Sequence, residues 1–440
     1  MTETLTAALN SPNLVERLRA LREVASLIAD GGEQTIPTIE VNNHVHTFYS
    51  FSPYSPAMVA YRAWKAGLQA VGIMDHDSVA GAEEMIEACK IIGIGSTVGC
   101  EVRVNFTGTS MEGKRLNNPD STNIVYISLH GIPRPRLPEV ASFLAPISAE
   151  RGRRNRRMVE ALNRATESFG LDPIDYDREV LARSHASEGG SVTERHILSA
   201  LSTKIIEKTG RGTTLVAFLE GGLGMGLPGR LREYLLDEQN PHYHYDLLGI
   251  LKSSFLPQFF IQPDESECLS VYRTVEFANS IGAIPCYAYL GDIAESPTGD
   301  KKAERFEDAF LDDLVVELKR IGFKAITYMP PRNTREQLDR IRTLCRESEL
   351  MEISGVDINS SRQSFSCPEI LDPAFHHLIE STWALIAHEK LASADERYSL
   401  FAADNPLAST PLSARLARYA EVGERLDPRS PEDAAAGAHF

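Results

Sequence analysis

The alternation of predicted strands and helices is the strongest constraint on how this chain of 440 residues folds. Short apolar segments predict seven strands, and segments with apolar residues at helical spacing separate most of them. Strands that alternate with helices pair in parallel, so the pattern predicts an α/β fold, either a barrel or an open doubly wound sheet. No G-x-G-x-x-G follows the first strand, so a dinucleotide-binding fold has no local support. The predicted strands are residues 38–43, 68–74, 96–106, 123–129, 283–289, 323–329 and 350–356.

One long interruption divides the alternating pattern. Residues 131–262 are predicted to be mainly helical with glycine-rich breaks, so we expect them to form an insertion that acts as a lid on a barrel made of 38–130 and 263–392. Residues 1–37 are predicted to form a helical leader. The C-terminal extension, 393–440, ends in small and polar residues that we expect to be disordered.

Composition argues against several classes of protein. The net charge is −16, which disfavours binding to a nucleic-acid polymer. The six cysteines are scattered and form no C-x-x-C pair, which favours a reducing compartment. No apolar run approaches the ~20 residues that a membrane helix needs, and the first residues do not resemble a signal peptide. We therefore expect a cytoplasmic protein that acts without a polymer or a membrane.

Titratable side chains gather where the first four predicted strands end. In parallel α/β folds, chemistry takes place at the carboxyl ends of strands. Side chains two residues apart on a strand point to the same side, so an H-x-H pair can hold one ion together. Imidazole and carboxylate groups together suit Zn, Mn or Fe. The residues at these strand ends are His44, His46, Asp75, His76, Glu101 and His130.

Each of these motifs also has a structural interpretation. Asp77 could cap the helix that is predicted to start near Val79. Glu101 could be a strand carboxylate with an ordinary partner. Because the motifs follow one another on successive strands, a metal site explains them better than separate structural roles do.

Three of these segments resemble the PHP family, named for polymerase and histidinol phosphatase. "HVHTFYS" is similar to its H-x-H-T-x-x-S motif, "GIMDHDSVAG" to its T-D-H-D-T-x-x-G motif and "VGCEVRV" to its G-x-E strand. Within the insertion, "RGRRNRRMVEAL" and "VTERHILSAL" resemble the R-x-x-R-x-x-x-M and R-x-H-I-A segments of a nucleotide-phosphatase branch. The resemblance extends over about residues 38–390.

The resemblance implies a distorted (β/α)7 barrel with a mainly helical insertion after strand four. It also implies two or three divalent ions, of Zn, Mn or Fe, in a centre that hydrolyses phosphoesters. Glu101 would bridge two ions, Asp75 would be a ligand or would orient one, and His196 would enter the site from the insertion. The implied ligands are His44, His46, His76, Glu101 and His130.

The chain departs from the family pattern at three places. Phe51 stands where the family often has aspartate, and Tyr289 in "AYLGD" stands where a histidine ligand is expected. The nearest match to a late S-D-x-H motif is "IAH", which gives His388 as a sixth candidate ligand or as an ordinary helix histidine. Replacements for missing ligands remain open among Asp292, Asp357 and Asn359.

These observations predict a metal-dependent hydrolase that cleaves a phosphoester of a small phosphorylated metabolite or nucleotide with a metal-activated water. Arg195, next to His196, is the predicted phosphate contact. Most of the arginine run in 151–157 is predicted to be a solvated helix face. Two alternatives remain: a metal-dependent C–N hydrolase, and a degenerate PHP domain that binds metal or ligand without turnover. The sequence leaves the oligomeric state open.

Overall fold

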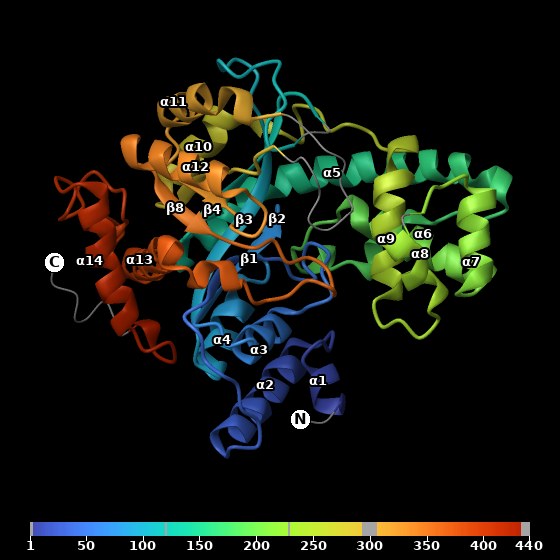
Figure 1. The fold of residues 1–440 in the computed structure, drawn as a ribbon, viewed down its shortest axis with the longest axis horizontal. Helices are drawn as coiled ribbons and strands as arrows, with labels where there is room; N and C mark the ends of the chain where they lie inside the picture. Colours follow the sequence, from blue (N-terminus) through green and yellow to red (C-terminus); the bar gives the residue numbers. More distant parts are fainter. Residues whose placement is uncertain (1–2, 119–120, 228, 293–305, 433–440) are drawn as a thin grey trace.

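A computed structural model describes residues 3–118, 121–227, 229–292 and 306–432. A mixed sheet forms its centre, with helices around it and a helical arm to one side (Figure 1). The tail predicted to be disordered, "SPEDAAAGAHF", begins at Ser430: its first three residues are described, with Glu432 paired to Lys90 at 2.8 Å, and 433–440 lie outside the described residues.

Seven strands follow one another around the sheet in the order β1-β2-β3-β4-β6-β7-β8, and a short β5 pairs with β3 outside this path. All pairings are parallel except those of β4, which runs antiparallel to both β3 and β6. The strands are β1 (Val41–Val45), β2 (Ala70–His76), β3 (Gly95–Asn105), β4 (Ile124–His130), β5 (Leu269–Ser270), β6 (Ile284–Ala288), β7 (Ala325–Tyr328) and β8 (Met351–Ser354).

The segment after β8 closes the sheet against β1. Val45 forms a parallel bridge with Ile358. The backbone N–H of Ile358 donates to the carbonyl of His44 (3.1 Å), and the N–H of His46 donates to the carbonyl of Ile358 (2.9 Å). The result is a nearly closed barrel, so the predicted barrel with a helical insertion after the fourth strand is confirmed.

The prediction of parallel pairing throughout is wrong for β4. Among the described residues, no helix connects β3 to β4, and a connection without a crossover helix favours antiparallel pairing. His130, the last residue of β4, therefore pairs with Ile284, the first residue of β6. It lies deeper in the barrel than the carboxyl ends of the parallel strands.

Helices cover the outside of the barrel, and local signals set their ends as the sequence predicted. Ser55 caps α3 by accepting a hydrogen bond from the N–H of Met58. Gly93 ends α4 in the left-handed region at φ 84°, where glycine has no steric penalty. The helices around the barrel are α3 (Pro56–Lys65), α4 (Ala82–Ile92), α10 (Val271–Ser280), α11 (Leu311–Ile321), α12 (Arg335–Glu347), α13 (His376–Ala394) and α14 (Leu412–Arg425).

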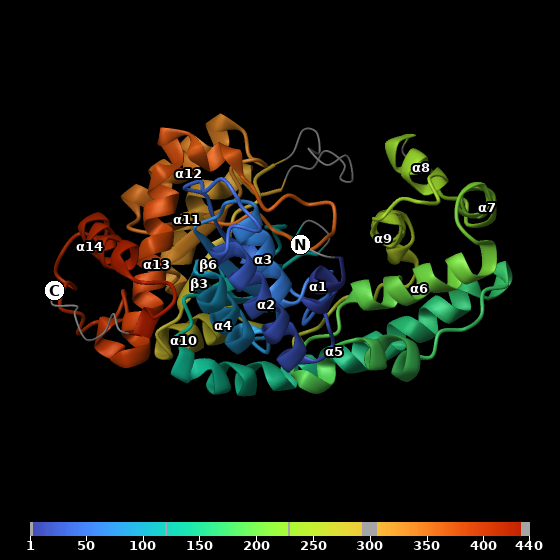
Figure 2. The ribbon, with the colours of Figure 1, turned by 90° about the horizontal axis from the view of Figure 1, so that it is seen from below.

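The insertion has an apolar core of its own, separate from that of the barrel. Its longest helix runs from beside the barrel to the far end of the arm, and a second helix lies alongside it (Figure 2). Phe51, in the loop after β1, packs against this core. The helices are α5 (Leu137–Thr166), α6 (Glu194–Thr209), α7 (Thr213–Ala217), α8 (Gly229–Leu236) and α9 (Tyr243–Ser254). Within the described part of the chain, no helix is both long and apolar enough to cross a membrane.

The leader forms α1 (Glu3–Ala8) and α2 (Leu14–Ala29); α2 packs on α3 and α4, and α1 packs on α2. A buried ion pair fixes α2: Arg17 is 0% exposed and donates to both oxygens of Glu84, at 2.8 and 2.5 Å. The same carboxylate accepts from the N–H of Ala57, and the Arg17 guanidinium lies 5.0 Å from the centre of the Phe48 ring. The leader is therefore tied to the loop that follows the first histidine pair.

Replacing Arg17 tests this attachment. Arg17→Met leaves Glu84 buried without its charge partner, so we expect the free energy of unfolding to fall by about 3–5 kcal/mol. Arg22→Met is the control, because its ion pair with Glu87 is exposed, and we expect a loss below about 1 kcal/mol. Urea denaturation of both variants measures the difference; equal losses would contradict the assignment.

Candidate metal centre

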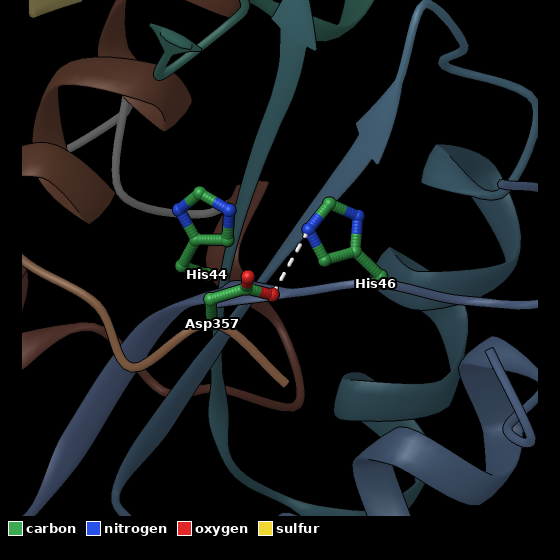
Figure 3. Close-up of side chains that lie close together, drawn as sticks. All are labelled: His44, His46 and Asp357. Atoms are coloured by element: carbon green, nitrogen blue, oxygen red, sulfur yellow. Dashed lines mark ion pairs between the residues drawn. The ribbon is translucent and has the colours of Figure 1, made fainter. Parts of the chain in front are cut away.

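The first group of candidate ligands lies where the barrel closes. His44 and His46 are both buried, and their ring centroids are 5.1 Å apart. The carboxylate of Asp357 joins them from the segment after β8, with its Oδ1 3.2 Å from Nε2 of His46 (Figure 3). One ligand atom from each of the three residues lies within 4.8 Å of the others. Two imidazoles and a carboxylate at this spacing can hold one divalent ion.

A second group shares His46 with the first. It consists of His46, His76 and Glu101, again with ligand atoms within 4.8 Å of one another. Oε2 of Glu101 lies 2.9 Å from Nδ1 of His76 and 4.0 Å from Nε2 of His44, so this carboxylate of the second group also lies near a histidine of the first. An imidazole nitrogen binds one ion, so a single nitrogen of His46 can complete only one group at a time.

The acidic ligands are held in the charged form that a metal needs. Burial alone would raise the pKa of Glu101, but the charges of His76, His44 and His46 outweigh burial and lower this pKa to about 2. Burial acts against ionisation of Asp357 as well, and its hydrogen bond and charge interaction with His46 hold its pKa below the usual range. Burial lowers the pKa of His44, against the opposing charges of Glu101 and Asp357.

Asp75 orients the loop that carries His46. Its Oδ1 accepts from the N–H of Thr47 (2.7 Å) and from the hydroxyl of Ser50 (2.6 Å), and its Oδ2 accepts from the hydroxyl of Thr47 (2.6 Å). Ser50 in turn lies 3.4 Å from Nδ1 of His46. These contacts favour the orienting role for Asp75 over the ligand role.

Glycine is required beside the first histidine. A Cβ added at Gly355 would lie 2.5 Å from Cβ of His44 and 3.1 Å from its backbone nitrogen. Real Cβ atoms essentially never come within 2.5 Å of another heavy atom, so Gly355 lets the end of β8 pack against His44.

His130 lies inside the barrel below the two groups. Ser128 pairs with Glu101, and His130 follows two residues later, so all three side chains belong to the same face of the sheet. Nε2 of His130 is buried and has no hydrogen-bond partner among the described residues. Burial lowers its pKa to about 3, so the ring is neutral. A neutral, unpartnered imidazole nitrogen fits the predicted ligand role, although His130 belongs to neither group.

His388 is not brought to the centre. It lies in α13, its Nε2 is 3.0 Å from the carbonyl of Gly131, and its Nδ1 accepts from the N–H of Leu400 at 2.9 Å. Because both ring nitrogens are occupied, the helix-histidine interpretation describes it. The residues that follow β8 take the place assigned to it: Asp357 is in the centre, and Asn359 donates to both of its oxygens at 2.8 and 2.9 Å.

Tyr289 and Asp292, after β6, have other partners. The hydroxyl of Tyr289 donates to Asp308 at 2.5 Å. Oδ1 of Asp292 accepts from the backbone N–H groups of Phe306 and Glu307. Neither side chain belongs to a ligand group, so of the three replacements left open only Asp357 supplies one.

The insertion reaches the centre through the start of α6. Arg195 donates from Nη1 to the carbonyl of Asn359 at 3.0 Å. Nδ1 of His196 accepts from the N–H of Thr193, and its ring packs edge-on against Phe51 with centroids 4.9 Å apart. Arg195 therefore stands beside Asp357, whereas His196 holds the helix start. Their predicted catalytic roles stay predictions.

Two arginines of the 151–157 run are buried, so the predicted solvated helix face does not include them. Arg151 is 2% exposed and forms ion pairs with Asp77 and Glu267, and Arg154 is also 2% exposed and bonds to Glu267. The helix-cap interpretation of Asp77 is wrong, because α4 begins at Ala82 with Gly81 as its N-cap.

The fold and the ligand groups define an α/β-barrel protein with a candidate metal centre, lined by histidines and carboxylates, at the barrel closure. The PHP domain matches residues 42–321, which is more than half of the chain. The chain belongs to the PHP domain family.

The individual proteins that the chain resembles share between 16% and 32% sequence identity with it over the matched residues. A 5'-3' exoribonuclease of Haemophilus influenzae is 32% identical over 74 residues, which are 17% of this chain and 27% of that protein. A proposed metal-dependent phosphoesterase of Bifidobacterium adolescentis superposes with a TM-score of 0.48 at 22% identity, covering 74% of this chain and 91% of its own. An amidohydrolase of Chromobacterium violaceum gives a TM-score of 0.47 at 16% identity, covering 74% and 89%.

Removing one carboxylate tests the first ligand group. Asp357→Asn takes away an anionic ligand and the partner of His46, so we expect affinity for Zn²⁺ or Mn²⁺ to fall at least about tenfold. Equilibrium metal titration with elemental analysis measures this, and His376→Ala, which removes an exposed histidine, serves as the control. Unchanged metal content in Asp357→Asn would exclude the assignment.

A buried carboxyl near Tyr289 predicts a pH dependence of stability. Burial raises the pKa of Glu307 to about 7, above its ordinary value near 4.5. The native state then keeps this proton while the unfolded state loses it, so stability falls by up to about 1.4 kcal/mol per pH unit as the pH rises from 4.5 to 7.

Glu307→Gln cannot titrate, and its amide oxygen can still accept from the N–H groups of Leu290 and Gly291. We expect this variant to gain stability relative to the native protein as the pH rises through that window. Urea denaturation at pH 5 and pH 7 measures the change. A constant difference between the two proteins would show that Glu307 titrates normally.

Proposed function

We propose that the protein is a metal-dependent hydrolase that cleaves a phosphoester of a small phosphorylated metabolite or nucleotide. The observation that carries the proposal is the pair of ligand groups that share His46, with Glu101 of the second group also 4.0 Å from His44 of the first. Histidine and carboxylate ligands in this arrangement suit Zn, Mn or Fe. Membership of the PHP domain family supports the same class.

The residues of the centre fall into those that would hold metal ions and those that would act on the substrate or on the ligands. His44, His46 and Asp357 would hold one ion, and His76 with Glu101 would contribute to a second. When bound, divalent ions supply an activated water at neutral pH and neutralise charge on phosphoryl oxygens. Residues outside the ligand set act on the substrate or on the ligands.

Three of those residues have defined positions. Arg195 is half-buried beside Asp357, where its guanidinium can contact a phosphoryl oxygen. Asp75 keeps the loop after β1 in place through Thr47 and Ser50. His196 fixes the start of α6 and thereby the position of Arg195.

The substrate class is proposed from chemistry and from one relative. The name of the H. influenzae protein describes cleavage of RNA from its 5' end, which is also phosphoester hydrolysis. A substrate panel should therefore include sugar phosphates, mononucleotides and a short oligoribonucleotide. Cyclic amides belong in the same panel, because a similar centre suits C–N hydrolysis.

Binding without turnover is the second candidate, and Tyr289 favours it. This side chain stands where the family has a histidine ligand and is bonded to Asp308. Phe51 is the other departure close to the centre, and it packs against the insertion. A protein of this kind would bind metal stoichiometrically and hydrolyse no member of the panel.

Two substitutions test the proposal. His46→Ala and Glu101→Gln should each abolish chelator-sensitive hydrolysis of a phosphomonoester, because each removes a ligand common to the centre, while leaving the thermal unfolding transition in place. His376→Ala should retain full activity. Unchanged turnover in both variants would reject the assigned site, and bound metal with no turnover of any substrate by the native protein would favour the binding role.

A further inference from the structure

β3 extends past the ligand groups and carries a buried arginine on the same face as a ligand. Glu101 and Arg103 are two residues apart on this strand, so both side chains project from one face. β2 ends at His76, which pairs with Glu101, whereas β3 continues to Asn105. Arg103 therefore lies on the mouth side of the centre, about 7 Å along the strand from Glu101.

Tyr126 fills the space between this arginine and the ligands. It is the register partner of Arg103 on β4. Its ring centroid is 6.0 Å from that of His76 and 5.9 Å from the guanidinium carbon of Arg103. The three side chains thus form a continuous row that leads from the ligand groups toward the insertion.

The guanidinium of Arg103 and the hydroxyl of Tyr126 can both form further hydrogen bonds. Arg103 is 7% exposed and bonds to one acceptor, from Nη2 to Oε1 of Glu267 at 3.2 Å, although a guanidinium carries five N–H donors. The hydroxyl of Tyr126 has no hydrogen-bond partner within the described parts of the chain. A buried arginine with free donors is costly unless an anion completes its bonding.

The carboxylates near Arg103 are shared with other cations. Glu267 is shared by Arg103, Arg151 and Arg154. Asp77 pairs with Arg151, and the carboxylate of Glu194 interacts with Lys252, Arg103 and Arg154. One carboxylate, that of Glu267, is thus divided among three guanidinium groups and satisfies Arg103 only in part.

We infer that Arg103 and Tyr126 form a phosphoryl-binding subsite on the His76–Glu101 side of the centre. The guanidinium offers a fork of donors and the phenol offers one more, which together match the oxygens of a tetrahedral phosphoryl group. Glu267 holds the guanidinium in position, so little side-chain freedom is lost on binding. Arg195 stands on the opposite side, next to Asp357. The inference rests on the proposed function, since it assumes a phosphorylated ligand.

Calorimetric titration of the Mn²⁺-loaded protein with inorganic phosphate tests the subsite without any turnover. Arg103→Met should raise the dissociation constant for phosphate at least about tenfold, and Tyr126→Phe should raise it about threefold or more. Arg103→Lys, which keeps the charge and loses the fork, should lie between the native protein and Arg103→Met.

Arg154→Met is the matched control, because Arg154 shares Glu267 with Arg103 and does not adjoin the ligand groups. It should change phosphate affinity less than about twofold if the effect belongs to Arg103. Thermal unfolding and metal content are measured for every variant. If Arg103→Met does not fold, Tyr126→Phe and Arg103→Lys decide the question.

Three results would overturn the subsite: unchanged affinity in Arg103→Met or in both substitute variants, an equal loss in Arg154→Met, or no phosphate binding by the native protein. Failure of the proposed function looks different. In that case the native protein binds phosphate through Arg103 and hydrolyses no phosphate ester of the panel.

Discussion

The backbone pairing between the end of β1 and Ile358 is the interaction on which the centre depends. Through it the barrel closes, and it holds Asp357 against the histidine that precedes Val45 and the one that follows it. Side chains reinforce the same seam: Asn43 donates to the carbonyl of Ser354 at 3.0 Å. Because the carboxylate ligand is carried by the seam, loosening the seam would separate the ligands even if every ligand residue were present.

Buried charges attach the added elements to the barrel close to the centre. Arg17 joins the leader to Glu84, and Arg151 joins the insertion to Asp77, the residue that follows the ligand His76. A buried ion pair adds little net stability, but losing one partner leaves an uncompensated charge, so such contacts specify one arrangement strongly. The leader and the insertion are therefore held in fixed positions beside the two loops that carry the histidines.

Much of the fold could be predicted from local pattern. Predicted segments correspond to seven of the strands, and Ser55 and Gly93 act as predicted, because caps and alternating apolar residues depend on nearby sequence. The direction of β4 could not be predicted in this way, since pairing is set by the connection and by neighbours distant in the chain. The leader shows the same limit: the apolar residues Leu14 and Leu27 of α2 are 45% and 39% exposed, while the charged Arg17 is buried.

The sequence predicts the candidate ligands that belong to a motif. It does not predict Asp357, which reaches the site only because the barrel closes. His44, His46, His76 and Glu101 lie in motifs and come together, whereas His388 was chosen over Asp357 because a short match to a motif carries no information on distance in space. Arg103 gave no signal, since an arginine in an apolar strand has meaning only once its face and neighbours are known.

The seam between β1 and the segment after β8 also orders events during synthesis. Its side-chain bond from Asn43 to Ser354 joins residues 311 positions apart. A growing chain therefore displays its first histidines long before the carboxylate that completes their group has been made. The complete ligand group is therefore assembled late in biogenesis, and a product of premature termination before Ile358 would lack the segment that closes the barrel.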